Sequence, residues 1–163
     1  MKVKKILVPT DFSEFSYRAV EYASELCGFF KARLILIHVK ELYPYGPEES
    51  FMILYNDGGL RETLTRKIEK EVLSLKNKKI ETEGHFLIGE PYSEIIDCAK
   101  KWEVDMIVMG THGRKGLSHL FLGSTAERVV RLAPCPVLVV KEGSEKRRAT
   151  IKIKNKTTRK RAG

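Results

Sequence analysis

Short apolar runs alternate along the chain with stretches of helical periodicity, and this alternation limits the folds available to it. The predicted strands are residues 3–8, 33–39, 79–88, 104–109 and 136–140. The third is the weakest prediction, because Gly84 interrupts its pattern. Apolar residues at spacings of three and four predict helices over residues 15–26, 60–75, 91–99 and 124–132. Ser13 is the expected N-cap of the first helix, and Pro91 suits the first turn of the third.

Continuously apolar strands between helices predict a parallel sheet covered on both faces. The predicted fold class is therefore α/β. Right-handed crossovers favour a doubly wound five-stranded parallel sheet, in the order 3-2-1-4-5, with helices on both faces. In such sheets ligands bind beyond the carboxyl ends of the strands, where the strand order reverses. We therefore expect a site beside the ends of the first and fourth strands.

The positive charge is concentrated at the end of the chain. The net charge of the 163 residues is +9. Residues 142–163 hold nine Lys/Arg and two Asp/Glu, whereas residues 1–141 hold twenty-one and nineteen. We predict one domain over residues 1–141 and a basic, disordered tail over residues 142–163. Residues 40–59 contain two prolines and three glycines without a clean period, which predicts a loop over most of this segment.

Two features predict a soluble, cytoplasmic protein without membrane contact. No stretch approaches about 20 uninterrupted apolar residues, and the N-terminal apolar run is too short for a signal sequence. The three cysteines, Cys27, Cys98 and Cys135, form neither a CxxC motif nor a short Cys/His cluster. We expect them to be reduced and to behave as small apolar residues.

The segment after the fourth predicted strand has the most chemistry to offer. Gly110 and Gly113 let backbone N–H groups approach an anion closely. Gly123 stands just before a helix whose first N–H groups have no partner within the helix and whose dipole end is positive. Further donors in the segment are Ser124, Thr125 and Arg114. Together they predict a phosphate site, although a glycine-rich loop with a capped helix also occurs without a ligand.

The spacing of this segment resembles a known motif. A glycine, two residues, a glycine, nine residues, then glycine and serine or threonine is the nucleotide motif of the ATP-binding universal stress proteins, and Gly110, Gly113, Gly123 and Ser124 match it. Residues 8–13, 34–39 and 133–140 also resemble segments of that family, and the similarity covers residues 1–141.

The resemblance implies a set of ligand contacts. Asp11 would face the ribose or adenine, although a helix-capping role is the alternative. Backbone groups of Val39 would meet the adenine edge, with Pro9 and Met109 nearby. The expected nucleotide-binding residues are Pro9, Thr10, Asp11, Val39, Met109, Gly110, Thr111, His112, Gly113, Arg114, Gly123, Ser124 and Thr125. The ligand would be ATP, ADP or AMP, with Mg²⁺ or Mn²⁺ bridging phosphates and no metal ligand from the protein.

The sequence argues against rapid catalysis. It has no Walker A spacing, no dinucleotide fingerprint after the first strand and no glycine-rich loop of the adenylating type there. No catalytic residue is predicted, since phosphoryl transfer needs a positioned base. His112 is a lone histidine within the phosphate loop, and autophosphorylation or slow ATP hydrolysis stays open as an alternative.

Two partners are expected besides the nucleotide. Residues 137–141 would form an edge strand, and the resembled family pairs such strands across a two-fold axis, which implies a homodimer. The basic tail gives the alternative of an adaptor for nucleic acid or another acidic surface. The favoured function is a dimeric, ATP-binding regulatory protein with slow or no hydrolysis.

Overall fold

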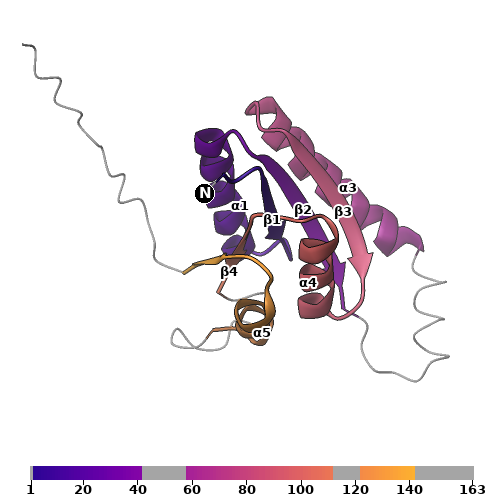
Figure 1. Ribbon diagram of the computed structural model, residues 1–163. Coiled ribbons are helices and arrows are strands. Elements are labelled where there is room, and N and C mark those ends of the chain that lie inside the picture. Colours follow the sequence, from indigo (N-terminus) through magenta and orange to yellow (C-terminus); the bar gives the residue numbers. More distant parts are fainter. Residues whose placement is uncertain (1, 42–57, 112–121, 142–163) are drawn as a thin grey trace, which may run out of the picture.

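The structure, a computed structural model, describes residues 2–41, 58–111 and 122–141. Its strands are β1 (Lys5–Pro9), β2 (Arg33–Lys40), β3 (Thr82–Ile88), β4 (Met106–Gly110) and β5 (Val137–Val140). Its helices are α1 (Glu14–Phe30), α3 (Gly58–Asn77), α4 (Pro91–Lys101) and α5 (Ser124–Leu132) (Figure 1). No helix in these ranges is both long enough and apolar enough to cross a bilayer.

The strands form one five-stranded sheet in the order β3-β2-β1-β4-β5. All four neighbouring pairs are parallel. This confirms the predicted strand order and the α/β class. The order reverses at β1, which pairs with β2 on one side and with β4 on the other.

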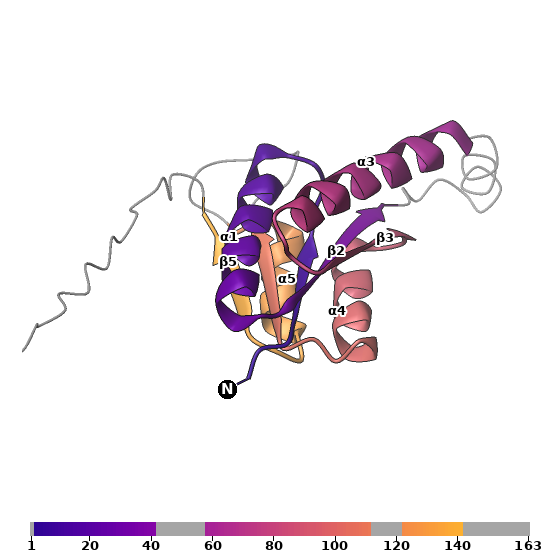
Figure 2. The same ribbon diagram turned by 90° about the horizontal axis from the view of Figure 1, so that it is seen from above.

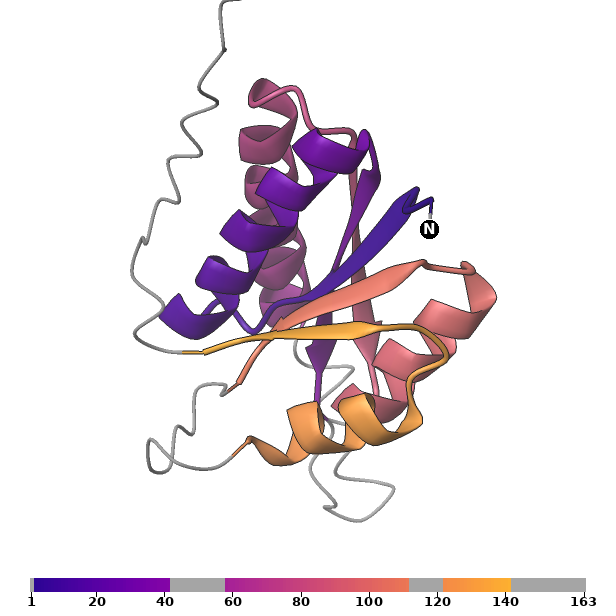
Figure 3. The same cartoon turned by 60° about the vertical axis from the view of Figure 1, so that its left-hand side comes forward.

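The described helices lie on both faces of the sheet (Figure 3). Helices α1 and α3 pack on one face over a cluster that includes Val8, Leu36 and Val108. Helices α4 and α5 pack on the other face over a cluster that includes Leu7 and Ile107. Neighbouring residues of a strand thus enter different cores, which is why the strands are apolar throughout.

Local capping rules explain where α1 and α4 begin. Ser13 is the N-cap of α1, and its hydroxyl oxygen accepts a hydrogen bond from the Ser16 backbone N–H at 3.3 Å. Pro91 occupies the first turn of α4, where the missing N–H removes no helical hydrogen bond. Both positions agree with the sequence prediction. Helix α1 ends at Lys31, whose φ of 55° is left-handed.

The structure corrects several predicted strand ends: β1 begins at Lys5 and β4 at Met106, each two residues later than predicted. At the margins of the segment 40–59, Lys40 pairs with Ile88 at the end of β2, and α3 begins at Gly58. The third strand begins at Thr82, three residues later than predicted, after a turn in which Lys79 has a φ of 62°. Residues 42–57 and the predicted tail, residues 142–163, lie outside the described ranges.

Gly84 does not interrupt β3 but lets a helix approach it. Helix α3 runs along the sheet beside β2 and β3 (Figure 2). A Cβ atom at Gly84 would collide with the Ile68 methyl group Cγ2 and would lie 2.7 Å from Cγ2 of Val72. The glycine is therefore a packing requirement of the contact between α3 and β3.

Candidate functional site

The carboxyl ends of β1 and β4 lie next to each other at one edge of the sheet. The Thr10 N–H donates to the Ile37 carbonyl oxygen at 2.8 Å, and the Thr111 N–H donates to the Val140 carbonyl oxygen at 3.1 Å. These bonds extend the sheet one residue beyond both strands. They place Thr10 and Thr111 at the reversal of strand order, where the sequence predicts the site.

The start of α5 is tied to the end of β4. The Gly123 N–H donates to the Thr111 carbonyl oxygen at 2.8 Å, and the Gly123 carbonyl oxygen accepts from the Glu127 N–H at 2.9 Å. Gly123 is thus the N-cap of α5. The two halves of the glycine segment, which are separated in sequence by residues 112–121, therefore meet in space.

Gly123 adopts a backbone conformation that any residue can adopt. Its φ is −60° and its ψ is 149°, which is extended. Serine would cap a helix better than glycine in this position, since a hydroxyl oxygen can accept from the first N–H groups of the helix. Backbone geometry does not require the glycine. The glycine adds no side chain of its own beside the positive end of the α5 dipole.

Asp11 lies in a tight turn between β1 and α1. Its Oδ1 accepts hydrogen bonds from the Ser13 backbone N–H at 3.0 Å and from the Ser13 hydroxyl at 2.5 Å. Phe12, between them, has a left-handed φ of 63°. The carboxylate therefore braces the residue that caps α1, while Ser13 and not Asp11 is the N-cap.

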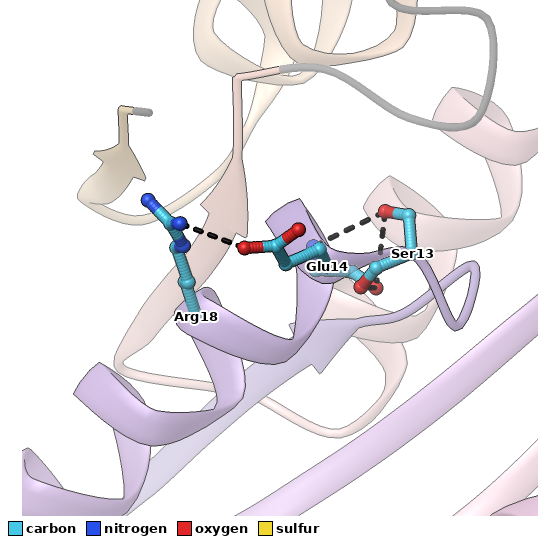
Figure 4. Close-up of polar contacts among 4 residues, drawn as sticks. Ser13, Glu14 and Arg18 are labelled. Carbon is cyan, nitrogen blue, oxygen red and sulfur yellow. Dashed lines mark hydrogen bonds and ion pairs between the residues drawn. The ribbon is translucent and has the colours of Figure 1, made fainter. Parts of the chain in front are cut away.

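The first turn of α1 carries an ion pair next to this turn. Glu14 Oε1 lies 2.8 Å from the Arg18 guanidinium, one helical turn later (Figure 4). Ser13 stands just ahead of the pair. Because Glu14 is largely exposed, the pair contributes well under about 1 kcal/mol to stability. The hydrogen bonds from Ser13 to Asp11 are the stronger constraint on the turn.

Three predicted apolar contacts share one face of the sheet. Met109 is buried in the cluster beneath α4 and α5, and Val39 packs against that cluster. Pro9 lies on the same face, because it is two residues beyond Leu7 of that cluster and strand residues alternate between faces. Helix α5, which begins at Ser124, covers this face.

Most of the predicted site residues are therefore gathered at one edge. The structure brings together the ends of three strands and the start of α5, with Pro9, Thr10, Asp11, Val39, Met109, Gly110, Thr111, Gly123, Ser124 and Thr125. His112, Gly113 and Arg114 lie outside the described residues. Among the described residues, no group of three or more His, Cys, Asp or Glu side chains is arranged to hold a metal ion.

His38 is a residue beside the site that the sequence patterns do not single out. The side chain is buried, with 6% of the residue exposed, and its Nδ1 lies 2.7 Å from the Thr10 carbonyl oxygen. The available signal was an ionisable residue that follows four consecutive apolar residues, 34–37, and directly precedes Val39.

Comparisons with known proteins show which family the chain belongs to. A model of the universal stress protein family matches residues 2–141. The chain belongs to this family. Universal stress protein MJ0531 of Methanocaldococcus jannaschii is 40% identical over 145 residues, which cover 85% of this chain and 82% of that protein.

Solved structures of universal stress proteins share the fold. The structure of UspA from Lactobacillus plantarum matches with a TM-score of 0.78 and 24% identity, covering 86% of this chain and 99% of that one. A universal stress protein from Archaeoglobus fulgidus, solved in complex with dAMP, matches with a TM-score of 0.61 and 22% identity, covering 86% of this chain and 100% of that one. The shared universal stress fold is the five-stranded parallel sheet described above.

Proposed function

We propose that this universal stress protein binds an adenine nucleotide, ATP, ADP or AMP, at the edge formed by β1, β2, β4 and the start of α5. The observation that carries the proposal is the hydrogen bond from the Gly123 N–H to the Thr111 carbonyl oxygen at 2.8 Å. It brings the first N–H groups of α5, which have no partner within the helix, to the residue that follows β4. Such a helix start favours phosphate through direct N–H donation and through its dipole.

The lack of a side chain at Gly123 supports phosphate as the occupant. The extended conformation would allow serine, which would stabilise α5 through a cap. Glycine instead leaves room for a ligand oxygen to approach the N–H groups of Ser124 and Thr125. An anion bound there would receive donors that α5 cannot satisfy internally.

The nucleoside would lie on the other side of the strand reversal. Apolar surface from Pro9, Val39 and Met109 is on the face that α5 covers, and it suits a purine ring. Asp11 supplies acceptor oxygens for ribose hydroxyl groups from the end of β1. The relative from Archaeoglobus fulgidus, solved with dAMP, supports this class of ligand.

We propose a regulatory role with slow or no hydrolysis. Rapid turnover needs a base held against the attacking water. Asp11 is a carboxylate two residues beyond the end of β1, and its Oδ1 already accepts two hydrogen bonds from Ser13. A divalent cation, Mg²⁺ or Mn²⁺, would be held through phosphate oxygens and water and not through a cluster of protein ligands.

The nucleotide released from the native protein tests this proposal. The purified protein is denatured, and the supernatant is examined by mass spectrometry. We expect an adenine nucleotide, or, where none is retained, stoichiometric binding of ATP with Mg²⁺ by calorimetry. The proposal would be refuted if the denatured protein released no adenine nucleotide and calorimetry detected no binding of ATP.

We also propose that the protein forms a homodimer through residues 137–141. Strand β5 is at the edge of the sheet, and Leu138 in it is 40% exposed. An apolar edge strand invites pairing with a second copy of itself. Light scattering should give a dimer at micromolar concentration, and Leu138→Lys should give a folded monomer. A monomeric unmodified protein would refute the dimer.

A further inference from the structure

The buried imidazole of His38 joins β2 to the residue that follows β1. Its Nδ1 lies 2.7 Å from the Thr10 carbonyl oxygen, and both residues are at most 6% exposed. A carbonyl oxygen can only accept, so Nδ1 carries the hydrogen and donates it. The bond spans 28 residues of sequence and is fixed by the pairing of β1 with β2.

His38 acts from the face opposite the proposed nucleotide. Leu36, two residues earlier, belongs to the cluster under α1 and α3, whereas Val39 packs under α4 and α5. On the face under α1 and α3, the imidazole is close to two aromatic rings, with centroid distances of 4.6 Å to Phe12 and 6.0 Å to Phe86. His38 would therefore affect the site through its hydrogen bond to Thr10, and it would not contact the nucleotide.

The bond completes the constraints on Thr10. The Thr10 N–H is held by the Ile37 carbonyl oxygen at 2.8 Å, and the Thr10 Oγ1 accepts from the Phe12 N–H at 3.1 Å. With its carbonyl oxygen held by His38, the peptide between Thr10 and Asp11 has a fixed orientation. That peptide leads through Asp11 into the left-handed Phe12, so it fixes the backbone from which the Asp11 side chain, itself held by Ser13, extends.

We propose that His38 is a positioning residue for the nucleotide site, holding the Thr10–Asp11 peptide in the orientation that presents Asp11. The inference rests on the proposed nucleotide binding. Without the imidazole donor, the buried Thr10 carbonyl oxygen loses its partner, and the peptide populates orientations in which it finds another. Only the fraction of molecules with the original orientation binds well, so the measured dissociation constant rises in inverse proportion to that fraction.

Three substitutions at His38 separate the donor from the packing. His38→Asn places an amide nitrogen where Nδ1 lies and keeps the donor, whereas His38→Leu removes it. His38→Gln keeps a polar amide of greater reach but moves its nitrogen away from the Nδ1 position, so it replaces the leucine variant if that one does not fold. Leu36→Val, on the same strand and face, is a control that loosens the core and keeps the imidazole donor of His38.

Calorimetry with ATP and Mg²⁺ is run at a temperature where circular dichroism shows each variant folded. We expect His38→Leu and His38→Gln to raise the dissociation constant about tenfold, and His38→Asn to stay within about threefold of the unmodified protein. Leu36→Val should lower thermal stability and leave the affinity unchanged. Equal affinities in all four variants, with ATP still bound, would overturn the role of His38 alone.

A second readout separates this inference from the proposed function. In NMR spectra the His38 Nδ1 should be protonated, and the Asp11 and Phe12 amide signals should move in His38→Leu but not in Leu36→Val. Failure of the unmodified protein to bind any adenine nucleotide would overturn the proposed function and the positioning role with it. An unprotonated Nδ1 would overturn the hydrogen bond itself, whether or not ATP binds.

Discussion

The backbone N–H of Gly123 donates a hydrogen bond of 2.8 Å to the carbonyl oxygen of Thr111. This bond connects the residue before α5 to the residue after β4, and Thr111 in turn is bound to Val140 at the end of β5. The start of α5 is consequently fixed to the rigid edge of the sheet. A ligand bound at the start of α5 would thus have a fixed position relative to the ends of the strands.

Gly123→Ser should separate stability from binding. The extended conformation of Gly123 accepts serine, and a serine N-cap is worth a few tenths of a kcal/mol more than glycine, so the melting temperature should be equal or slightly higher. The new side chain would occupy space that phosphate needs, and we expect ATP affinity to fall at least about tenfold. Thermal unfolding and calorimetry measure the two effects. Unchanged affinity would contradict phosphate binding at this helix.

Asp11→Asn tests the nucleoside end of the site. The Asn side-chain oxygen can still accept from the Ser13 N–H and hydroxyl, so stability should change by less than about 0.5 kcal/mol. One acceptor oxygen becomes an NH₂ donor, and we expect ATP affinity to fall about tenfold. Calorimetry on the folded variant measures it. Unchanged affinity would leave Asp11 as a brace for the α1 cap and nothing more.

Two glycine-to-alanine substitutions should have opposite effects on stability. Gly84→Ala forces a methyl group against Ile68 and Val72 and should cost about 1–3 kcal/mol. Gly28→Ala, in α1, adds a methyl group with no atom within 4 Å and should stabilise by about 0.5–1 kcal/mol. Urea unfolding measures both. A neutral Gly84→Ala would show that α3 packs less closely on β3 than described.

Alkaline pH should destabilise the protein through its buried thiols. Burial raises the pKa of the Cys27 thiol from 9.0 to about 12 and that of Cys98 to about 11. The folded state therefore binds more protons than the unfolded state above pH 9. The stabilising contribution of Cys27 is complete below pH 9 and is lost as the pH rises toward 12.

The Cys27→Ala variant checks that sign. The free energy of unfolding in urea should fall between pH 8 and pH 10.5 in the unmodified protein, and it should fall less steeply in the variant. This pH range brackets the lower half of the window in which the contribution of Cys27 is lost. Other groups titrate in this range, so the difference between the two proteins is the measured quantity. Identical slopes would contradict a protonated, buried Cys27.

The sequence predicted the fold well because its signals are local. Apolar strands and helical periods are set by burial on two faces, and right-handed crossovers then leave few strand orders. The element ends were less accurate: the pattern of residues 79–81 does not reveal the left-handed turn at Lys79 that precedes β3. In the sequence Gly84 resembled an interruption of the third strand. Its role is to make room for side chains of α3, an element that the pattern of the strand itself does not reveal.

The candidate site was predicted from spacing and resemblance, and its contacts were not. Glycine positions indicated where the backbone carries no side chain, but only the fold brings Thr111 within hydrogen-bonding distance of Gly123. The bond from His38 to Thr10 depends on the register of β1 with β2, which no single segment encodes. Long-range side-chain contacts of this kind are what the sequence alone left out.

Amide chemical-shift mapping during an ATP titration tests the central claim most directly. If the nucleotide lies across the ends of β1, β2 and β4 with its phosphates at α5, the largest shifts will be at Asp11, Gly110, Gly123, Ser124 and Thr125. The amide signals around Arg33 and Thr82, at the amino ends of the strands, should not shift. Saturable shifts centred on those amino ends, or no saturable shifts at millimolar ATP, would contradict the account.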